Sequence, residues 1–265
     1  MIDMSSVGPG PVHPSAADAQ RVISLIDLTD LNDEHDPVGL RDLVDRALEH
    51  GVPAVCVWPE FVGTVVAALD AEPERGTCSI ATVVNFPGGD DPIADVSSTT
   101  RDALAAGADE IDLVLPYVAL RGGDPEAPRA MVQAIAQIVH AHTGRGDRRA
   151  ELKVILETGE LGSVDLVTWA AQLAIDAGAD FIKTSTGKTA VSATLDAFAP
   201  MVDAVAQADR TIGLKPSGGI RTVAEAIEYL AVVDSRLGAD WATPATFRFG
   251  ASSLLDDAIA VALTA

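Results

Sequence analysis

Lysine is scarce in this sequence of 265 residues, which holds four lysines beside fourteen arginines: Lys153, Lys183, Lys188 and Lys215. Lysine is ordinarily among the commonest residues, and arginine can replace it wherever only surface charge is needed. Arginine cannot lose its proton and act as a nucleophile, whereas lysine can. The few lysines that remain are therefore the first candidates for a role that requires an amine.

Cysteines and long apolar runs are also scarce. Cys56 and Cys78 each lie in an apolar, strand-like stretch, which favours two buried free thiols in a reducing compartment over a disulfide and gives neither a catalytic role. No apolar stretch approaches the roughly 18 residues of a membrane span. The first twenty residues lack the basic and apolar regions of a signal peptide. These absences predict a cytoplasmic protein with no membrane partner.

Positive charge is in short supply as well. The chain carries 18 Lys and Arg against 39 Asp and Glu, a formal net charge of −21. Such an excess argues against nucleic acid or an anionic membrane as a partner. The acidic residues are scattered, as on a solvated outer surface. An anionic substrate would therefore need a local basic pocket.

Strands and helices are expected to alternate through most of the chain. Residues 1–20 hold Pro, Gly, Ser and Ala without periodicity and are predicted to be an N-terminal extension. Short β-branched runs then predict strands at 21–28, 53–58, 79–86, 110–115, 152–157, 180–184, 211–215 and 247–251. Amphipathic stretches predict helices near 37–50, 60–70, 92–106, 126–142, 163–177, 192–207, 222–236 and 252–263.

This eightfold alternation predicts that residues 21–265 form a single (β/α)8 TIM barrel of the α/β class. Three connections read Gly-Ala-Asp, as expected where a helix stops at glycine and the chain turns back. The alternative, an open doubly wound sheet, is disfavoured because no GxGxxG sequence follows the first strand.

The active site of such a barrel lies at the C-terminal ends of its strands. The polar residues expected there are Asp27, Asn85, Asp112, Glu157, Lys183 and Lys215. Alternation along each strand turns Lys183, Lys215 and Asp112 into the barrel, because an unpaired charge facing the helices would be costly to bury. Lys153 lies near the start of its strand and is assigned to the opposite, stabilising end.

Two lysines on adjacent strands together with a carboxylate suggest Schiff-base chemistry, in which a neutral amine attacks a carbonyl and the resulting iminium acts as an electron sink. An ordinary lysine is protonated at neutral pH, and a neighbouring ammonium opposes that protonation. We therefore expect Lys183 to be the nucleophile, Lys215 the neighbour that favours its neutral form and Asp112 the group that shuttles protons. The alternative is purely structural, with Lys183 paired to Asp112 and Lys215 paired to Glu157.

The segments after the last three strands are rich in Gly and hydroxyl residues, which let backbone N–H groups close on an anion. The substrate-binding residues expected there are Thr186, Gly187, Lys188, Gly218, Gly219, Arg221, Gly250, Ser252 and Ser253, with Asp27 on the first strand. A phosphate is the expected anion, because barrels often hold one in this sector. The alternative is that the serines are helix caps and the glycines are turns.

No metal or organic cofactor is expected. The histidines fall in the extension, on helices or at helix ends and not at strand ends: His13, His35, His50, His140 and His142. This distribution disfavours a zinc-dependent aldolase.

The chain resembles the deoxyribose-phosphate aldolase family. The segments that carry the resemblance are LIDLTDLN (25–32), VVNFPGG (83–89), GADEIDLVLPY (107–117), KVILETGEL (153–161), GADFIKTSTGK (178–188), GLKPSGGIRT (213–222) and FRFGASSLLDD (247–257). They extend over most of the chain, and the two that hold Lys183 and Lys215 are the most specific.

The resemblance implies a class I aldolase that reversibly cleaves 2-deoxy-D-ribose 5-phosphate to D-glyceraldehyde 3-phosphate and acetaldehyde. It implies the roles already expected for Lys183, Asp112 and Lys215, and it implies a homodimer. Members of similar length end in a tail with a tyrosine that assists proton transfer, whereas this sequence ends Ala262-Leu263-Thr264-Ala265. The resemblance thus assigns no group to that step. The alternatives are a transaldolase-like Schiff-base barrel and a barrel that binds phosphosugars without catalysis.

Overall fold

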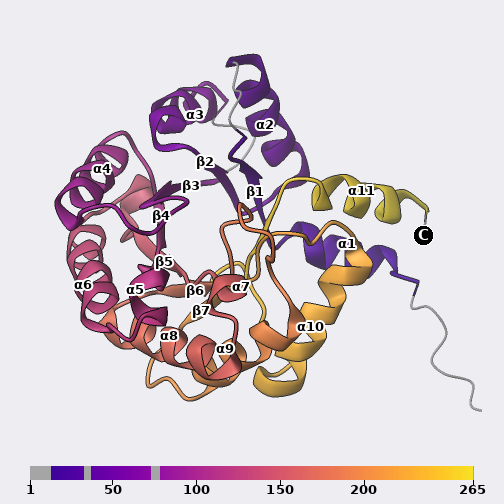
Figure 1. Cartoon of the computed structure of the whole chain (residues 1–265). Helices are drawn as coiled ribbons and strands as arrows, with labels where there is room; N and C mark the ends of the chain where they lie inside the picture. Colours follow the sequence, from indigo (N-terminus) through magenta and orange to yellow (C-terminus); the bar gives the residue numbers. More distant parts are fainter. Residues whose placement is uncertain (1–12, 33–36, 73–77, 265) are drawn as a thin grey trace, which may run out of the picture.

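Eight parallel strands form the centre of the molecule, and a helix follows each of them (Figure 1). The computed structural model describes residues 13–32, 37–72 and 78–264. The strands are β1 (Ile26–Asp30), β2 (Ala54–Val57), β3 (Ser79–Val84), β4 (Glu110–Val114), β5 (Glu151–Ile155), β6 (Phe181–Lys183), β7 (Gly213–Lys215) and β8 (Phe249–Ala251).

The sheet closes on itself. Its ladder runs β7-β6-β5-β4-β3-β2-β1-β8, and parallel bridges join the two ends at Leu214 with Phe247 and at Ser217 with Gly250. The helices that follow the strands form an outer ring (Figure 1): α2 (Pro37–His50), α3 (Val62–Asp70), α4 (Ile93–Ala105), α6 (Glu126–His140), α8 (Val164–Ala177), α9 (Leu195–Ala206), α10 (Val223–Leu237) and α11 (Leu254–Thr264). The predicted (β/α)8 barrel is confirmed.

The start of the barrel differs from the sequence prediction. Residues 21–23 belong to helix α1 (Ala16–Ile23), and the first strand begins only at Ile26, so the strand predicted at 21–28 was wrong in its first half. A capping box of Ser15 and Asp18 starts the helix. The run RVISLIDL contains the end of this helix and the start of the strand, and no Gly or Pro separates the two. The apolar residues of both elements therefore look like one continuous strand. Residues 1–12 of the expected extension lie outside the described residues.

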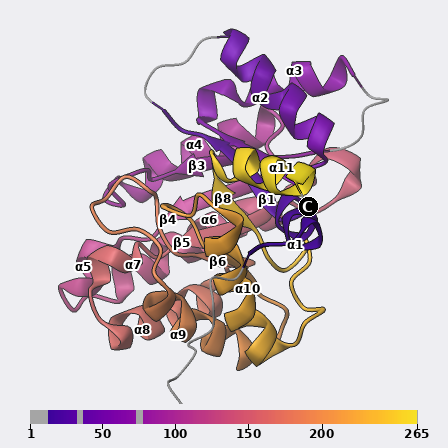
Figure 2. The ribbon, with the colours of Figure 1, turned by 90° about the vertical axis from the view of Figure 1, so that its right-hand side faces the viewer.

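Helix α1 packs between α10 and α11, and Figures 1 and 2 both show it beside α11. The guanidinium of Arg21 donates two hydrogen bonds, of 2.8 and 2.7 Å, to the carboxylate of Asp234 on α10. Ala19 and Val22 are fully buried. The helix therefore covers the seam at which the first and last parts of the barrel meet.

Two of the Gly-Ala-Asp connections share a further role. Gly178 takes φ 116° and ends α8, as expected of a glycine in the left-handed region. The carboxylate of Asp180 then accepts the Leu152 N–H at 2.9 Å, and the carboxylate of Asp109 accepts the Ile80 N–H at 3.0 Å. Each aspartate thus ties the start of its strand to the preceding strand.

Polar and apolar side chains divide the barrel interior. A small apolar cluster of Leu31, Cys56, Ala81 and Val83 lies on the side of β1 to β3. Below the lysines, the Phe181 ring fills the space beside Gly213, where a Cβ atom would lie 2.2 Å from the ring. Glycine is therefore required on β7 to fit an aromatic ring inside the barrel. Buried charged side chains from β1, from β4 to β7 and from the residue just before β8 share the interior with these apolar groups.

Two short helices were not expected: α5 (Tyr117–Arg121) and α7 (Thr158–Leu161). They follow β4 and β5 at the C-terminal ends of the strands, and short 3₁₀ turns occur over Pro59–Phe61 and Arg145–Asp147. Among the helices of the described residues, none is long and apolar enough to cross a membrane.

Candidate active site

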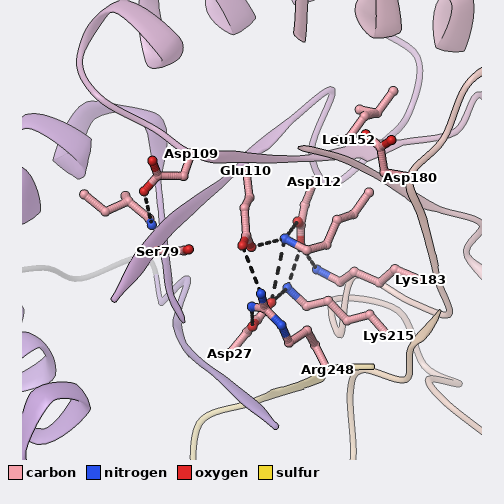
Figure 3. Close-up of polar contacts among 12 residues, drawn as sticks. Asp27, Ser79, Asp109, Glu110, Asp112, Leu152, Asp180, Lys183, Lys215 and Arg248 are labelled. Carbon is pink, nitrogen blue, oxygen red and sulfur yellow. Dashed lines mark hydrogen bonds and ion pairs between the residues drawn. The ribbon is translucent and has the colours of Figure 1, made fainter. Parts of the chain in front are cut away.

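Seven charged side chains converge inside the barrel (Figure 3). They come from β1, β4, β5, β6, β7 and the residue just before β8, and each is at most 5% exposed: Asp27, Glu110, Asp112, Lys153, Lys183, Lys215 and Arg248. Four of these groups are cationic and three are carboxylic. If all were ionised, the cluster would hold one positive charge in excess.

One carboxylate oxygen joins the two lysines singled out from the sequence. Asp112 Oδ2 accepts hydrogen bonds from Lys183 Nζ at 2.8 Å and from Lys215 Nζ at 2.9 Å. Lys183 and Lys215 are direct partners in the register of β6 and β7, which brings both amines to the same level. Within the described residues, Lys183 pairs with Asp112 alone of the three buried carboxylates. The three residues expected to converge therefore do so.

The charges shift the ionisation of these groups. Burial alone would raise the pKa of Asp112, but the ammonium groups of Lys153, Lys183 and Lys215 hold it well below its ordinary value. Burial alone would lower the pKa of Lys215, but the carboxylates of Asp112 and Asp27 raise it. At neutral pH Asp112 is thus a carboxylate and Lys215 a lasting positive charge.

Three further residues of the cluster were missed in the sequence. Lys153 pairs with Glu110 and lies 3.3 Å from Asp112 Oδ1, so it belongs to the cluster and not to a separate stabilising end. Arg248 Nη1 donates to Asp27 at 2.5 Å and Nη2 donates to Glu110 at 3.1 Å. Strand alternation could have placed all three inside, because Glu110 shares its face with Asp112 and Arg248 shares its face with Gly250. The prediction looked for site residues at the strand ends, left out Glu110 and Arg248, and assigned Lys153 to the opposite end of the barrel.

Asp27 occupies a different position from the one expected of a substrate-binding residue. It is fully buried, its Oδ2 lies 2.5 Å from Lys215 Nζ and 3.8 Å from Lys153 Nζ, and it does not line the cavity described below. These cations lower its pKa despite burial. The geometry makes Asp27 a partner of Lys215 beneath the site.

Glu157 does not pair with Lys215, as the structural alternative had required. Its backbone has φ 54°, in the left-handed region, and its carboxylate turns toward the segment after β6. There it accepts the Thr186 hydroxyl at 2.5 Å, the Thr186 N–H at 3.2 Å and the Thr189 hydroxyl at 3.2 Å. Glu157 therefore fixes the start of the segment that carries Lys188.

A cavity of about 240 Å³ opens above Lys183. Apart from Asp27, all of the substrate-binding residues expected from the sequence line it: Thr186, Gly187, Lys188, Gly218, Gly219, Arg221, Gly250, Ser252 and Ser253. Gly187, Gly218 and Gly219 have φ between 79° and 85°, which suits glycine. Ser252 and Ser253 precede α11 and are exposed. The cavity thus joins an amine to a concentration of backbone N–H, hydroxyl and cationic groups.

The two thiols are free and buried, as expected from the sequence. Burial raises the pKa of Cys78 to about 12. In residues 13–32, 37–72 and 78–264, no group of three or more His, Cys, Asp or Glu side chains could hold a metal ion.

Comparison with known proteins relates this arrangement to a family. Residues 21–258 match the model of the DeoC/LacD family of aldolases. A deoxyribose-phosphate aldolase of Agrobacterium fabrum is 45% identical over 245 residues, which cover 92% of this chain and 91% of that protein. The crystal structure of a putative deoxyribose-phosphate aldolase from Coccidioides immitis has a TM-score of 0.77 at 27% identity and covers 90% of this chain and 85% of that one.

A second structural relative extends the likeness of the fold. A putative deoxyribose-phosphate aldolase from Toxoplasma gondii has a TM-score of 0.83 at 24% identity, covering 94% of this chain and 95% of that one. With a family match over residues 21–258 and 45% identity to a curated relative, the chain belongs to the DeoC/LacD family of aldolases.

Proposed function

We propose that this aldolase reversibly cleaves 2-deoxy-D-ribose 5-phosphate to D-glyceraldehyde 3-phosphate and acetaldehyde through a Schiff base on Lys183. The observation that carries the proposal is the shared oxygen of Asp112, 2.8 Å from Lys183 Nζ and 2.9 Å from Lys215 Nζ, together with the opening of Lys183 into a cavity lined by segments rich in Gly and hydroxyl residues. The name of the Agrobacterium fabrum relative supports this choice of substrate.

In the cleavage direction, the neutral amine of Lys183 attacks C1 of the open-chain aldehyde, and loss of water leaves an iminium. The C3 hydroxyl then gives up its proton, the C2–C3 bond breaks, and its electron pair moves into an enamine as glyceraldehyde 3-phosphate leaves. Protonation of C2 and attack of water on the iminium carbon release acetaldehyde and restore the amine. Formation and breakdown of the carbinolamine move protons at the Lys183 nitrogen, which lies 2.8 Å from Asp112 Oδ2.

The low pKa of Asp112 makes it a weak base by itself. We therefore assign it a relay role, in which Asp112 takes up a proton in one step and returns it in the next, while the ammonium of Lys215 on the same oxygen stabilises the carboxylate between the two steps. The fixed positive charge of Lys215 also opposes the approach of a second positive charge at Lys183. Lys153, Glu110 and Arg248 hold this arrangement from below.

The phosphate would lie against the segments after β6, β7 and β8. Successive N–H groups around Gly187, Gly218 and Gly219 suit a phosphate, and α10 and α11 begin directly after two of these segments. Lys188 and Arg221 supply local positive charge at this cavity, although the chain as a whole has a net charge of −21. The same cavity is lined by these segments and by Lys183, so one ligand can contact both.

Reductive trapping tests the proposal. Borohydride reduction in the presence of deoxyribose 5-phosphate should fix one adduct per chain on Lys183, located by peptide mass mapping, because its amine is the one that reaches the cavity beside a second ammonium. Lys183→Met is the matched control and should give no adduct. Chelators are expected to leave turnover unchanged. An adduct on Lys188 or Lys215 instead, or unchanged turnover by Lys183→Met, would contradict the proposal.

A further inference from the structure

The buried hydroxyl of Ser217 lies at the cavity and makes no hydrogen bond to the described residues. It follows Lys215 by two residues and therefore faces the same interior side. The residue is 4% exposed and lines the cavity with Lys183, and its Oγ has no hydrogen-bond partner among the described residues. A buried hydroxyl without a partner costs free energy, so its presence calls for a physical reason.

The surrounding structure fixes this hydroxyl in place. Thr184 Oγ1 accepts the Ser217 N–H at 2.9 Å and donates to the Ser217 carbonyl at 3.1 Å, which anchors the backbone to the end of β6. On the other side, a Cβ atom on Gly250 would lie 2.2 Å from Ser217 Oγ. The hydroxyl therefore occupies space that exists only because residue 250 is glycine.

The position of the hydroxyl along the site follows from its neighbours. Ser217 directly precedes Gly218 and Gly219 of the proposed phosphate site. The same Cβ on Gly250 would lie 3.2 Å from Lys215 Cε, so the hydroxyl is also next to the buried lysines. A ligand with its phosphate on the glycine segment and its carbonyl carbon at Lys183 must pass its intermediate carbons across Ser217.

We infer that Ser217 is a substrate-binding residue that selects for a hydroxyl on the carbon next to the phosphate-bearing carbon. The inference rests on the proposed function, in which this group is the C4 hydroxyl of deoxyribose 5-phosphate, or the C2 hydroxyl of glyceraldehyde 3-phosphate in the direction of synthesis. A serine hydroxyl both donates and accepts, so it can pair with a sugar hydroxyl in either sense.

Condensation with two acceptors tests the inference. Acetaldehyde is combined with D-glyceraldehyde 3-phosphate or with 3-oxopropyl phosphate, which lacks the hydroxyl, and kcat/KM for the acceptor is measured in the wild type and in Ser217→Ala. The substitution should lower kcat/KM about tenfold for glyceraldehyde 3-phosphate and less than about twofold for 3-oxopropyl phosphate. Because the lost hydroxyl has no partner in the fold, Tm should stay unchanged or rise.

Ser185→Ala is the matched control. Ser185 follows Lys183 by two residues, its Oγ is also buried without a partner among the described residues, and it does not line the cavity. Its kcat/KM should stay within about twofold for both acceptors. Equal losses for both acceptors in Ser217→Ala, a lowered Tm, or the same loss in Ser185→Ala would overturn the inference. A wild type that condenses neither acceptor would instead reject the proposed function, and the inference with it.

Discussion

At the scale of single residues, the site depends on one carboxylate oxygen that serves two amines. Asp112 Oδ2 binds both Lys183 and Lys215, and Lys215 is also held by Asp27. Lys215 keeps its proton because these carboxylates raise its pKa. Lys215 therefore carries a positive charge throughout the neutral pH range. Substitutions at Lys215 that remove or keep this charge can then distinguish two roles of Lys215: an electrostatic effect on Lys183 and direct proton transfer.

Replacing Lys215 tests that separation. In Lys215→Leu the charge is lost and Asp112 stabilises a protonated Lys183 more strongly, so the acid limb of the kcat/KM profile should move upward by about one to two pH units. Lys215→Arg retains the charge and should keep the limb nearer its original position, even if crowding lowers the maximum rate. The measurement is cleavage of deoxyribose 5-phosphate from pH 5.5 to 10.

An unshifted acid limb in Lys215→Leu, with only the plateau lowered, would contradict charge tuning and favour a direct role in proton transfer. Thermal melts of both variants serve as the control, because Lys215 is fully buried and its loss leaves Asp27 with fewer partners. The melts should show that Lys215→Leu and Lys215→Arg stay folded from pH 5.5 to 10, so that the acid limbs of their kcat/KM profiles can be compared.

Strand alternation was enough to predict which three residues converge, but not the full cluster. Lys183, Lys215 and Asp112 are charged residues in apolar strands, and burial toward the helices would leave them unpaired. Lys153 was misjudged because its place near the start of its own strand was taken as its level in the barrel, whereas the register of β4 and β5 pairs Lys153 directly with Asp112. The pairing of Glu157 with Thr186 depends on a backbone φ of 54°, which composition does not reveal for a glutamate.

At the scale of elements, the proposed phosphate site is built by three short segments that leave β6, β7 and β8. A capping box of Thr222 and Glu225 fixes the start of α10, and Glu157 holds the segment after β6. Neither Ser252 nor Ser253 donates or accepts a side-chain hydrogen bond within the described chain, so the interpretation of these serines as helix caps gains no support. Their hydroxyls remain available to a ligand.

Ser252→Asp tests these segments. A carboxylate there would face the phosphate dianion, so kcat/KM for deoxyribose 5-phosphate should fall by at least about tenfold, while kcat/KM for unphosphorylated deoxyribose changes little. Ser252→Asn is the matched control, since it has nearly the same shape without the charge. Equal losses for both sugars would mean that the segments only shape the barrel.

Helices whose buried apolar residues recur at a regular spacing were predicted well, and helices without such a spacing were missed. Helix α2 runs from Pro37 to His50 as predicted, because its apolar positions repeat at helical spacing. Helices α5 and α7 have five and four residues and carry no periodic signal that a window could detect. Helix α1 was missed because its apolar face runs directly into that of β1.

At the scale of the whole molecule, assembly and location are still predictions. A homodimer is expected from the family resemblance, whereas the solved structure of deoxyribose phosphate aldolase from Aeropyrum pernix is described as tetrameric, at 25% identity and a TM-score of 0.69. Several large apolar side chains are exposed on the barrel surface, including Val118, Val164 and Trp169. Light scattering on the purified protein would determine the number of subunits.

Two whole-molecule charge effects should act in opposite directions as the pH falls. The net charge of −21 repels itself near neutrality, and this repulsion weakens as surface carboxylates gain protons toward the pI of about 4.3. The buried carboxylates behave differently, because cations lower the pKa of Asp27, Glu110 and Asp112 in the folded state. Their contribution is fully present above the ordinary carboxyl pKa of about 4 and is lost as the pH falls toward the folded-state values.

Salt separates the two effects, because it screens exposed charges far more than buried ones. At ~10 mM NaCl, Tm should rise as the pH falls from 8 to about 5 and then drop steeply below about 4. At ~500 mM NaCl the rise should flatten while the acid drop persists, because the seven-residue cluster is at most 5% exposed. Calorimetry at both salt concentrations measures this, with Asp234→Asn, which removes a partly buried pair with Arg21 outside the cluster, as a control that should keep the acid drop. If high salt also abolished the acid drop, acid unfolding would be governed by surface charge and not by the cluster inside the barrel.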